Sequence, residues 1–193
     1  IYSAGNDLLT LINDILDLSK VEAGKIEVQW ENVSLHNLLT SIEQKFTPIA
    51  NDKGVQFYLN IADDIPKMLT TDSQRIKQII NNLLSNAFKF TSEGDVKILV
   101  QLPTEIPTNI KNLKATEAIS ISVTDTGIGI SKDKQQSVFE AFQQADGSTS
   151  RRYGGTGLGL SISRQLARLL NGELAVTSEK NKGNTFTLYL PNK

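Results

Sequence analysis

Asn82, Asn86 and Lys89 follow one another at steps of four and three residues in a segment whose apolar pattern predicts a helix. At these spacings the three side chains project from one helical face. An amide oxygen is a neutral ligand that Mg²⁺ accepts while it keeps water and phosphate in its shell, and a lysine is a point charge for phosphate. The face therefore offers a metal and phosphate site, although an ordinary solvated helix face also explains an isolated pair of asparagines.

A second candidate site follows a predicted strand that ends at Asp125. Gly127 and Gly129 come directly after it, and glycines allow a backbone to approach a flat ligand closely. The carboxylate can accept a hydrogen bond from an exocyclic amine, while Ile128 or Ile130 supplies apolar contact. A simple Asp-x-Gly turn that ends a strand is the alternative.

The third candidate is the stretch GGTGLGL at residues 154–160, just before a helix expected to begin near Leu158. Backbone N–H groups and the helix dipole at such a position favour phosphate. Arg151 and Arg152 add donors near the start of the loop. The glycine spacing fits neither a P-loop nor a dinucleotide-binding motif. A phosphate cradle, a hinge and a flexible linker all remain open on this stretch alone.

Apolar periodicity predicts the elements that must position these residues. Helices are expected over 1–20, over 35–54 after an N-cap at Ser34, over 73–90 after an N-cap at Asp72, and over 158–172 with Gly172 at the end; a short helix runs through Val138 and Phe142. Strands are expected over 26–30, 55–61, 96–102, 118–125, 173–179 and 184–190, with an exposed loop over 103–117. Without regular βαβ alternation, this order predicts an α+β layered fold.

The first predicted helix carries two neighbouring apolar stripes, one through Leu8, Leu11, Ile15 and Leu18, the other through Leu9, Ile12 and Leu16. Two stripes favour a helix with partners on two sides, as in a bundle, over a helix lying on its own domain. No cap precedes the pattern, so we expect the chain to be part of something larger.

The composition further limits the kinds of protein that this chain can be. The chain has 193 residues, no cysteine and a net charge of −1, which suits one domain of moderate size, with or without an appendage. Disulfides and thiolate metal sites are excluded, and the absence of cysteine is compatible with a reducing cytosol. The charge argues against nucleic-acid binding. No signal peptide or membrane-spanning run is seen, so we expect no direct membrane contact by this chain and a cytoplasmic location.

Taken together, the motifs form an ordered set: NNLLSNAFKFT, DTGIGI, VFEAFQQAD, GGTGLGL and KGNTFTLYLP. From about residue 34 to 191 the chain resembles the catalytic, ATP-binding domain of sensor histidine kinases, in the GHKL superfamily shared with DNA gyrase. The resemblance implies a two-layer α/β sandwich, with a mixed sheet covered by helices. It also implies two parts: the second helix of a dimerisation domain at 1–24 and the catalytic domain at 25–193.

The resemblance further implies Mg-ATP as the ligand. Asn86 would hold Mg²⁺ with help from Asn82, Lys89 would meet phosphate, and Asp125 would accept from the adenine amine. Residues 139–155 would form a lid over ATP, with Phe139 and Phe142 at its base, and Arg151 or Arg152 would approach the γ-phosphate. The full set of implied ATP-binding residues is Asn82, Asn86, Lys89, Phe90, Asp125, Gly127, Gly129, Ile130, Arg151, Gly155, Thr156, Gly157, Leu158, Gly159 and Thr185, the last acting through water.

Asn82 also bears on mechanism. Relatives that hydrolyse ATP, such as gyrase, carry a glutamate base at this place, and an amide cannot accept a proton from water. The resemblance therefore implies transfer of the γ-phosphoryl group to a histidine on the dimerisation domain. The only histidine here, His36, is not expected to serve. Implied partners are that domain, a response-regulator receiver domain and a second subunit, with a hybrid kinase as one option. A conformational ATPase and a nucleotide-binding regulatory module are the alternatives.

Overall fold

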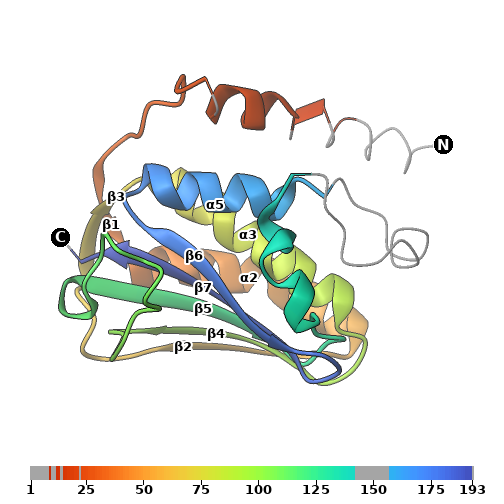
Figure 1. Ribbon diagram of the computed structural model, residues 1–193. Coiled ribbons are helices and arrows are strands. Elements are labelled where there is room, and N and C mark those ends of the chain that lie inside the picture. The colour runs from red at the N-terminus through yellow and green to blue at the C-terminus, as the bar shows by residue number, and fades with distance from the viewer. Residues whose placement is uncertain (1–8, 10–11, 14, 22, 142–156, 193) are drawn as a thin grey trace.

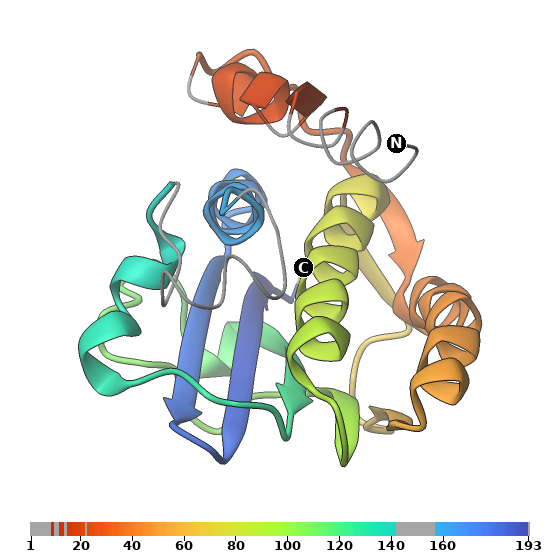
Figure 2. The same ribbon diagram turned by 90° about the vertical axis from the view of Figure 1, so that its right-hand side faces the viewer.

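Helices α2 (Leu35–Lys53), α3 (Ser73–Phe90) and α5 (Gly159–Leu169) cover one face of a five-stranded sheet. The computed structural model describes residues 9, 12–13, 15–21, 23–141 and 157–192. Figure 1 shows the helices above the sheet, and Figure 2 shows the same two layers after a quarter turn. The expected two-layer α+β sandwich is confirmed.

The strands of this sheet are β2 (Gln56–Ile61), β4 (Asp95–Gln101), β5 (Ala118–Asp125), β6 (Glu173–Glu179) and β7 (Gly183–Pro191), in the spatial order β2-β4-β5-β7-β6. The β2–β4 pair is parallel and the other pairs are antiparallel. In β5 and β7 register, Asp125 lies opposite Asn184 and Thr124 opposite Thr185. The sheet is therefore mixed, as the resemblance implies.

A single apolar core lies between the layers. Alternate residues of β4, β5 and β7 are buried beneath the helices, as a strand with one covered face requires. Helix α3 contributes the opposing side, with Ile76, Ile79, Ile80, Leu83, Leu84, Ala87 and Phe88 buried. Its remaining face stays free for polar residues, which places the candidate site on this helix.

The helix caps explain where α2 and α3 begin. The Ser34 hydroxyl accepts a hydrogen bond from the Asn37 N–H at 3.3 Å, and the Asp72 carboxylate accepts from the Arg75 N–H at 3.1 Å. Both predicted N-caps are confirmed. Helix α2 continues through Pro48 and ends before Gly54, whose φ of 67° is left-handed.

Three sequence-based assignments were wrong. Residues 25–30 form no strand: the strand begins only at β1 (Glu31–Ser34), which pairs with β3 (Met68–Thr71). β3 does not extend to residues 25–30, and Trp30 is 50% exposed. The helix expected through Val138 is a 3-10 turn, Ser137–Phe139, and Phe142 lies outside the described residues. At the end of α5 the left-handed residue is Asn171 (φ 58°) rather than Gly172. Asparagine tolerates this conformation because its short side chain bonds locally.

Two 3-10 turns complete the described elements, Ala115–Glu117 and Lys132–Lys134, and the first of them ends the loop over 103–117 that the sequence predicts. Near the N-terminus, residues 15–21 are helical and lie on the side of the helix layer away from the sheet (Figures 1 and 2). Leu9, Ile12, Ile15 and Leu16 are exposed there. No helix within the described part of the chain is both long and apolar enough to cross a membrane.

Candidate functional site

Helix α3 carries a polar face along its whole length. Arg75, Gln78, Asn82, Asn86 and Lys89 recur at three- and four-residue steps, so they share one side of the helix. Asn82, Asn86 and Lys89 are each half-buried, which distinguishes them from an ordinary solvated face. The structure thus brings the two asparagines and the lysine together, as their spacing predicts.

The N-terminus of α5 packs directly against Asn82. A Cβ added to Gly159 would lie 2.9 Å from Asn82 Cγ and closer still to Oδ1. The Asn82 amide Nδ2 donates a hydrogen bond to Ser163 Oγ at 2.9 Å. Gly159 is therefore required for close approach of the two helices, and its neighbour Gly157 adopts a left-handed φ of 69°.

No side chain among the described residues caps the start of α5, because the apolar side chain of the N-cap residue Leu158 cannot accept a hydrogen bond. Leu158 is fully buried and fixes the position of this turn. A helix start without a side-chain cap or an acidic residue in its first turn suits an anion. This end of α5 lies directly beside the Asn82 face of α3.

Lys89 and Phe90 lie at the C-terminal end of α3. The Lys89 ammonium is 5.0 Å from the centroid of the Phe90 ring, and burial lowers the pKa of Lys89. A Cβ on Gly127 would lie 2.6 Å from the Phe90 carbonyl oxygen. The end of α3 is therefore in direct contact with the turn that follows Asp125.

Asp125 is 4% exposed at the end of β5. Its Oδ1 accepts from the Gly127 N–H at 2.9 Å, and the Asn184 amide donates to Oδ1 at 3.1 Å and to Oδ2 at 3.0 Å. Burial raises the pKa of Asp125, and the hydrogen bonds from Asn184 and Gly127 oppose that rise. These donors hold the carboxylate beside the Gly127 turn, which in turn contacts the end of α3.

The glycines after Asp125 serve the protein backbone. Gly129 has a φ of 66°, and a Cβ on it would lie 2.8 Å from the Glu179 carbonyl carbon. The Ile130 N–H donates to Ser178 Oγ at 2.7 Å, while Gln135 Nε2 donates to the Ile130 carbonyl at 3.1 Å. These contacts tie the turn over residues 127–130 to β6. The close approach that the glycines allow is thus to neighbouring protein chain.

The structure places Thr185 on the opposite face of the sheet from Asp125. Successive residues of a strand point to opposite faces, and Asn184, not Thr185, shares the face of Asp125. The Thr185 hydroxyl lies 3.0 Å from Thr124 Oγ1, on the face away from the helices. Sequence reasoning missed Asn184, Ser178 and Gln135. Only strand register, which a single sequence does not reveal, could have found them.

The remaining residues of the predicted set fall into two groups. Phe139 packs at the edge of the core, with its ring centroid 6.2 Å from that of Phe186 and 4.9 Å from the Arg164 guanidinium carbon. Phe142, Arg151, Arg152, Gly155 and Thr156 lie outside the described residues. A cavity of about 310 Å³ exists between α2 and β2, but none of the candidate residues lines it.

The residue types fit Mg-ATP on chemical grounds. In the described ranges, no three His, Cys, Asp or Glu side chains gather to bind a metal. Magnesium would therefore depend on neutral amide oxygens, water and phosphate, a combination that it accepts. The described candidate residues lie along α3. At one end the start of α5 packs beside Asn82, and at the other end the turn after Asp125 contacts Phe90.

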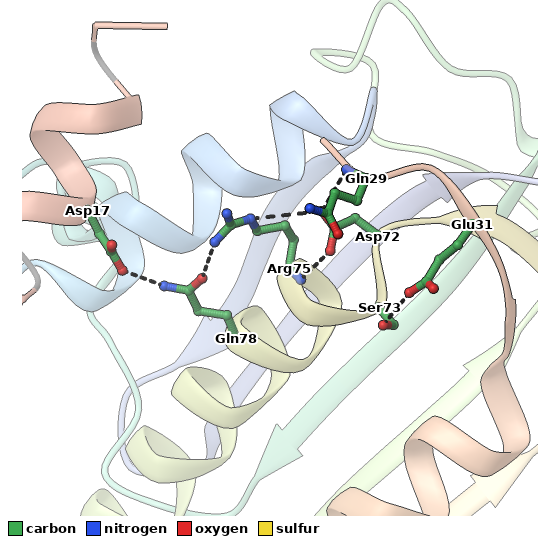
Figure 3. Close-up of polar contacts among 7 residues, drawn as sticks. All are labelled: Asp17, Gln29, Glu31, Asp72, Ser73, Arg75 and Gln78. Atoms are coloured by element: carbon green, nitrogen blue, oxygen red, sulfur yellow. Dashed lines mark hydrogen bonds and ion pairs between the residues drawn. The ribbon is translucent and has the colours of Figure 1, made fainter. Parts of the chain in front are cut away.

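A separate polar chain joins α3 to the N-terminal helix (Figure 3). Gln78 Nε2 donates to Asp17 Oδ2 at 2.9 Å, and Arg75 Nη1 donates to Gln78 Oε1 at 3.3 Å. Asp72 Oδ2 accepts from the Gln29 N–H at 3.1 Å and lies 4.0 Å from Arg75 Nε, at the limit of an ion pair. The contact uses the same face of α3 as the asparagines.

A mixed sheet covered on one face by helices, with a polar α3 and a buried aspartate at a strand end, defines an ATP-binding domain of the GHKL class. Residues 71–193 match the family described as histidine kinase-, DNA gyrase B-, and HSP90-like ATPases, and the chain belongs to that family.

Its relatives include named kinases. The chain is 41% identical over 190 residues to the autoinducer 2 sensor kinase/phosphatase LuxQ of Vibrio vulnificus, which covers 98% of the chain and 21% of LuxQ. It is 42% identical over 192 residues to hybrid signal transduction histidine kinase K of Dictyostelium discoideum, covering 99% of the chain and 16% of the relative. The chain therefore spans about a fifth or less of these proteins.

Among solved structures, full-length ShkA in complex with AMPPNP superposes with a TM-score of 0.82 at 30% identity. The match covers 98% of the chain and 36% of ShkA, so it includes the N-terminal helix as well as the two-layer domain. The fold and the family are thus established for this chain.

Proposed function

We propose that this chain binds Mg-ATP and transfers the γ-phosphoryl group to a histidine on a helical dimerisation domain. One observation carries the proposal: Asn82 presents an amide beside the start of α5, and its Nδ2 is bound to Ser163 Oγ. The position that holds a glutamate base in ATP-hydrolysing relatives thus has no proton acceptor for water. The family membership and the named kinases among the relatives support the same conclusion.

Different residues would bind the metal ion, the phosphates and the base. Asn86, with Asn82, would hold Mg²⁺, and Lys89 and the start of α5 would meet phosphate oxygens. Asp125 would accept from the adenine amine. ATP supplies the phosphoryl group, and the protein contributes positioning and charge stabilisation, which suffice for phosphoryl transfer.

Partners follow from the same proposal. We infer that the acceptor histidine lies in a helix that packs on the exposed apolar residues of the N-terminal helix, within a homodimer. A response-regulator receiver domain would take the phosphoryl group next, an inference supported by the hybrid kinases among the relatives. Such chemistry suits a cytoplasmic domain without direct contact to membrane or nucleic acid.

The test supplies a histidine-bearing dimerisation helix in trans, with γ-labelled ATP and Mg²⁺. Acid-labile label on that helix is the expected result. Steady phosphate release without transfer would instead indicate an ATPase, and binding without either would indicate a regulatory module. Asn86→Ala should abolish Mg²⁺-dependent binding and transfer. Ser85→Ala, an exposed neighbour on the same helix, is the matched control and should behave as wild type. Wild-type transfer by Asn86→Ala would exclude the magnesium role.

A further inference from the structure

Strand β2 is the outermost strand on one side of the five-stranded sheet, and only β4 pairs with it (Figure 1). At the two ends of this pairing, the N–H groups of Gln56 and Ala62 donate to backbone carbonyls at 2.9 Å. The backbone groups of alternate residues point to the same side of a strand, so the even-numbered residues of β2 face β4. The N–H and carbonyl groups of Phe57, Leu59 and Ile61 therefore face outward. No backbone hydrogen bond between described residues reaches these outward groups.

The sequence of β2 lacks the usual protection of an edge strand. Native edge strands are commonly kept apart by charged side chains, by proline or by a covering loop. The six residues of β2, QFYLNI, include no charged residue, proline or glycine. The other edge strand, β6, begins at Glu173 and ends at Glu179, and Gln135 Nε2 donates to its Ser178 carbonyl at 2.7 Å. Of the two edges, β2 is the one open to a further strand.

The outward groups of β2 match those of a second β2 strand that runs antiparallel to it. Residues that face each other in a hydrogen-bonded antiparallel pair exchange both of their bonds. With Leu59 opposite Leu59 of a second copy, Phe57 of each copy lies opposite Ile61 of the other. All three outward residues then find partners at once. The strand is thus self-complementary about a two-fold axis at Leu59, the symmetry of most protein dimers.

The side chains support the same register. Phe57, Leu59 and Ile61 are only partly buried and pack against the core on the helix side of the sheet. Phe57 also lines the cavity of about 310 Å³ between α2 and β2. In the self-paired register, Ile61 of the second copy lies beside Phe57, next to this cavity. Pairing would therefore cover apolar side chains as well as satisfy backbone groups.

We propose that β2 is a self-association edge, through which two copies of this chain pair antiparallel and join their sheets. The self-complementary register favours a second copy over a different protein as the occupant. A pair of six-residue strands is small beside the about 1,200–2,000 Å² that stable interfaces bury, so the association should be weak and appear in concentrated solution. The inference goes beyond the proposed function and does not depend on bound nucleotide.

Disulfide cross-linking tests the register, because the chain contains no cysteine of its own. Tyr58 and Asn60 are exposed, and the register places Tyr58 of one copy opposite Asn60 of the other in a non-hydrogen-bonded pair, with Cα atoms about 4.5 Å apart. Like residues lie diagonally, about 7–8 Å apart, beyond the usual reach of a disulfide. A mixture of Tyr58→Cys and Asn60→Cys should therefore cross-link about tenfold more than either variant alone. Thr177→Cys, exposed on β6, is the matched control and should not cross-link with Asn60→Cys.

Hydrogen exchange of the wild-type chain, followed by NMR in dilute and in concentrated solution, gives a second test that needs no variant. The N–H groups of Phe57, Leu59 and Ile61 should exchange quickly in dilute solution and about tenfold more slowly in concentrated solution. Those of Tyr58 and Asn60, bonded to β4, should be slow in both. Association through the N-terminal helix leaves the β2 edge uncovered, so it produces neither signal.

Three results would overturn the inference. Slow exchange of the outward groups in dilute solution would show that the chain itself covers the edge. Protection only after another protein is added would assign the edge to a different partner. Equal cross-linking by the single variants and by their mixture would show association without the two-fold register.

Discussion

Gly159→Ala tests the contact on which the phosphate side of the site depends. The added Cβ would lie 2.9 Å from Asn82 Cγ, whereas ordinary contacts begin at 3.4 Å, and Oδ1 is closer than Cγ. The Asn82 amide must therefore move by about 1 Å to restore normal packing distances. It is the end of a side chain, so the movement is possible, but it breaks the 2.9 Å bond to Ser163.

Stability and function should respond differently to this change. Alanine in a helix is favoured over glycine by up to about 1 kcal/mol, and loss of the Asn82–Ser163 bond costs about 1 kcal/mol. The two effects nearly cancel, so the free energy of unfolding should stay within about 1 kcal/mol of wild type. Displacing a positioning group by about 1 Å can reduce a reaction rate about a hundredfold. We expect that scale of loss in phosphoryl transfer.

The assay pairs urea denaturation with transfer of label from γ-labelled ATP to a histidine-bearing helix. Gly54→Ala is the control, because its φ of 67° strains an alanine while nothing lies within 4 Å of the new Cβ. That variant should lose about 1 kcal/mol of stability and keep wild-type transfer. Wild-type transfer by Gly159→Ala would refute the claim that Asn82 must remain beside Ser163.

Three further changes test other parts of the structure. Ser34→Ala removes the α2 cap and should lower the free energy of unfolding by about 1 kcal/mol in urea, whereas no change would show that the cap is dispensable. Burial raises the pKa of Asp125 in the folded state, so its contribution to stability is fully present at pH values below the ordinary aspartate pKa and is lost as the pH rises through the raised pKa. The free energy of unfolding of wild type relative to Asp125→Asn, measured in urea, should therefore fall as the pH rises over that range. A difference that does not change with pH would contradict the burial effect. Gln78→Leu removes the bond to Asp17, so hydrogen exchange over 15–21 should quicken while exchange in α3 stays slow.

The elements predicted well are those whose signals are local. The caps at Ser34 and Asp72 and the apolar face of α3 depend on residues within a few positions of one another, so one sequence reveals them. The pair β1–β3 depends on residues about forty positions apart, with four residues in each strand. Alternating apolar residues at 26–30 predicted a strand, but no strand among the described residues pairs with that segment.

The site shows the same division. Asn82 and Asn86 share one helix face, as their spacing predicts, and Asp125 ends a strand, as the glycines after it predict; their roles in binding stay predictions. The sequence did not reveal that Asn184 rather than Thr185 shares the face of Asp125, because a strand places neighbours on opposite faces and only the pairing with β5 decides which face is which. The sequence indicated that Gly127 and Gly129 allow a close approach of the backbone, but only the structure shows which atoms approach them, those of Phe90 and Glu179.

The polar face of α3 carries both the contact to the N-terminal helix and the candidate residues Asn82 and Asn86, and the strengths of its contacts decide which part moves first. Ile79 and Ile80 on the opposite side are fully buried, and burying each such side chain stabilises the packing by about 1.5–3 kcal/mol. The bond from Gln78 to Asp17 is one hydrogen bond, with a net contribution of about 1 kcal/mol. Val21 is buried in the core and Leu18 packs against it, so these two residues are held by apolar contacts as well. A displacement of Asp17 should therefore break its bond to Gln78 before it shifts α3. The Asp17–Gln78 contact can break while Asn82 and Asn86 keep their positions.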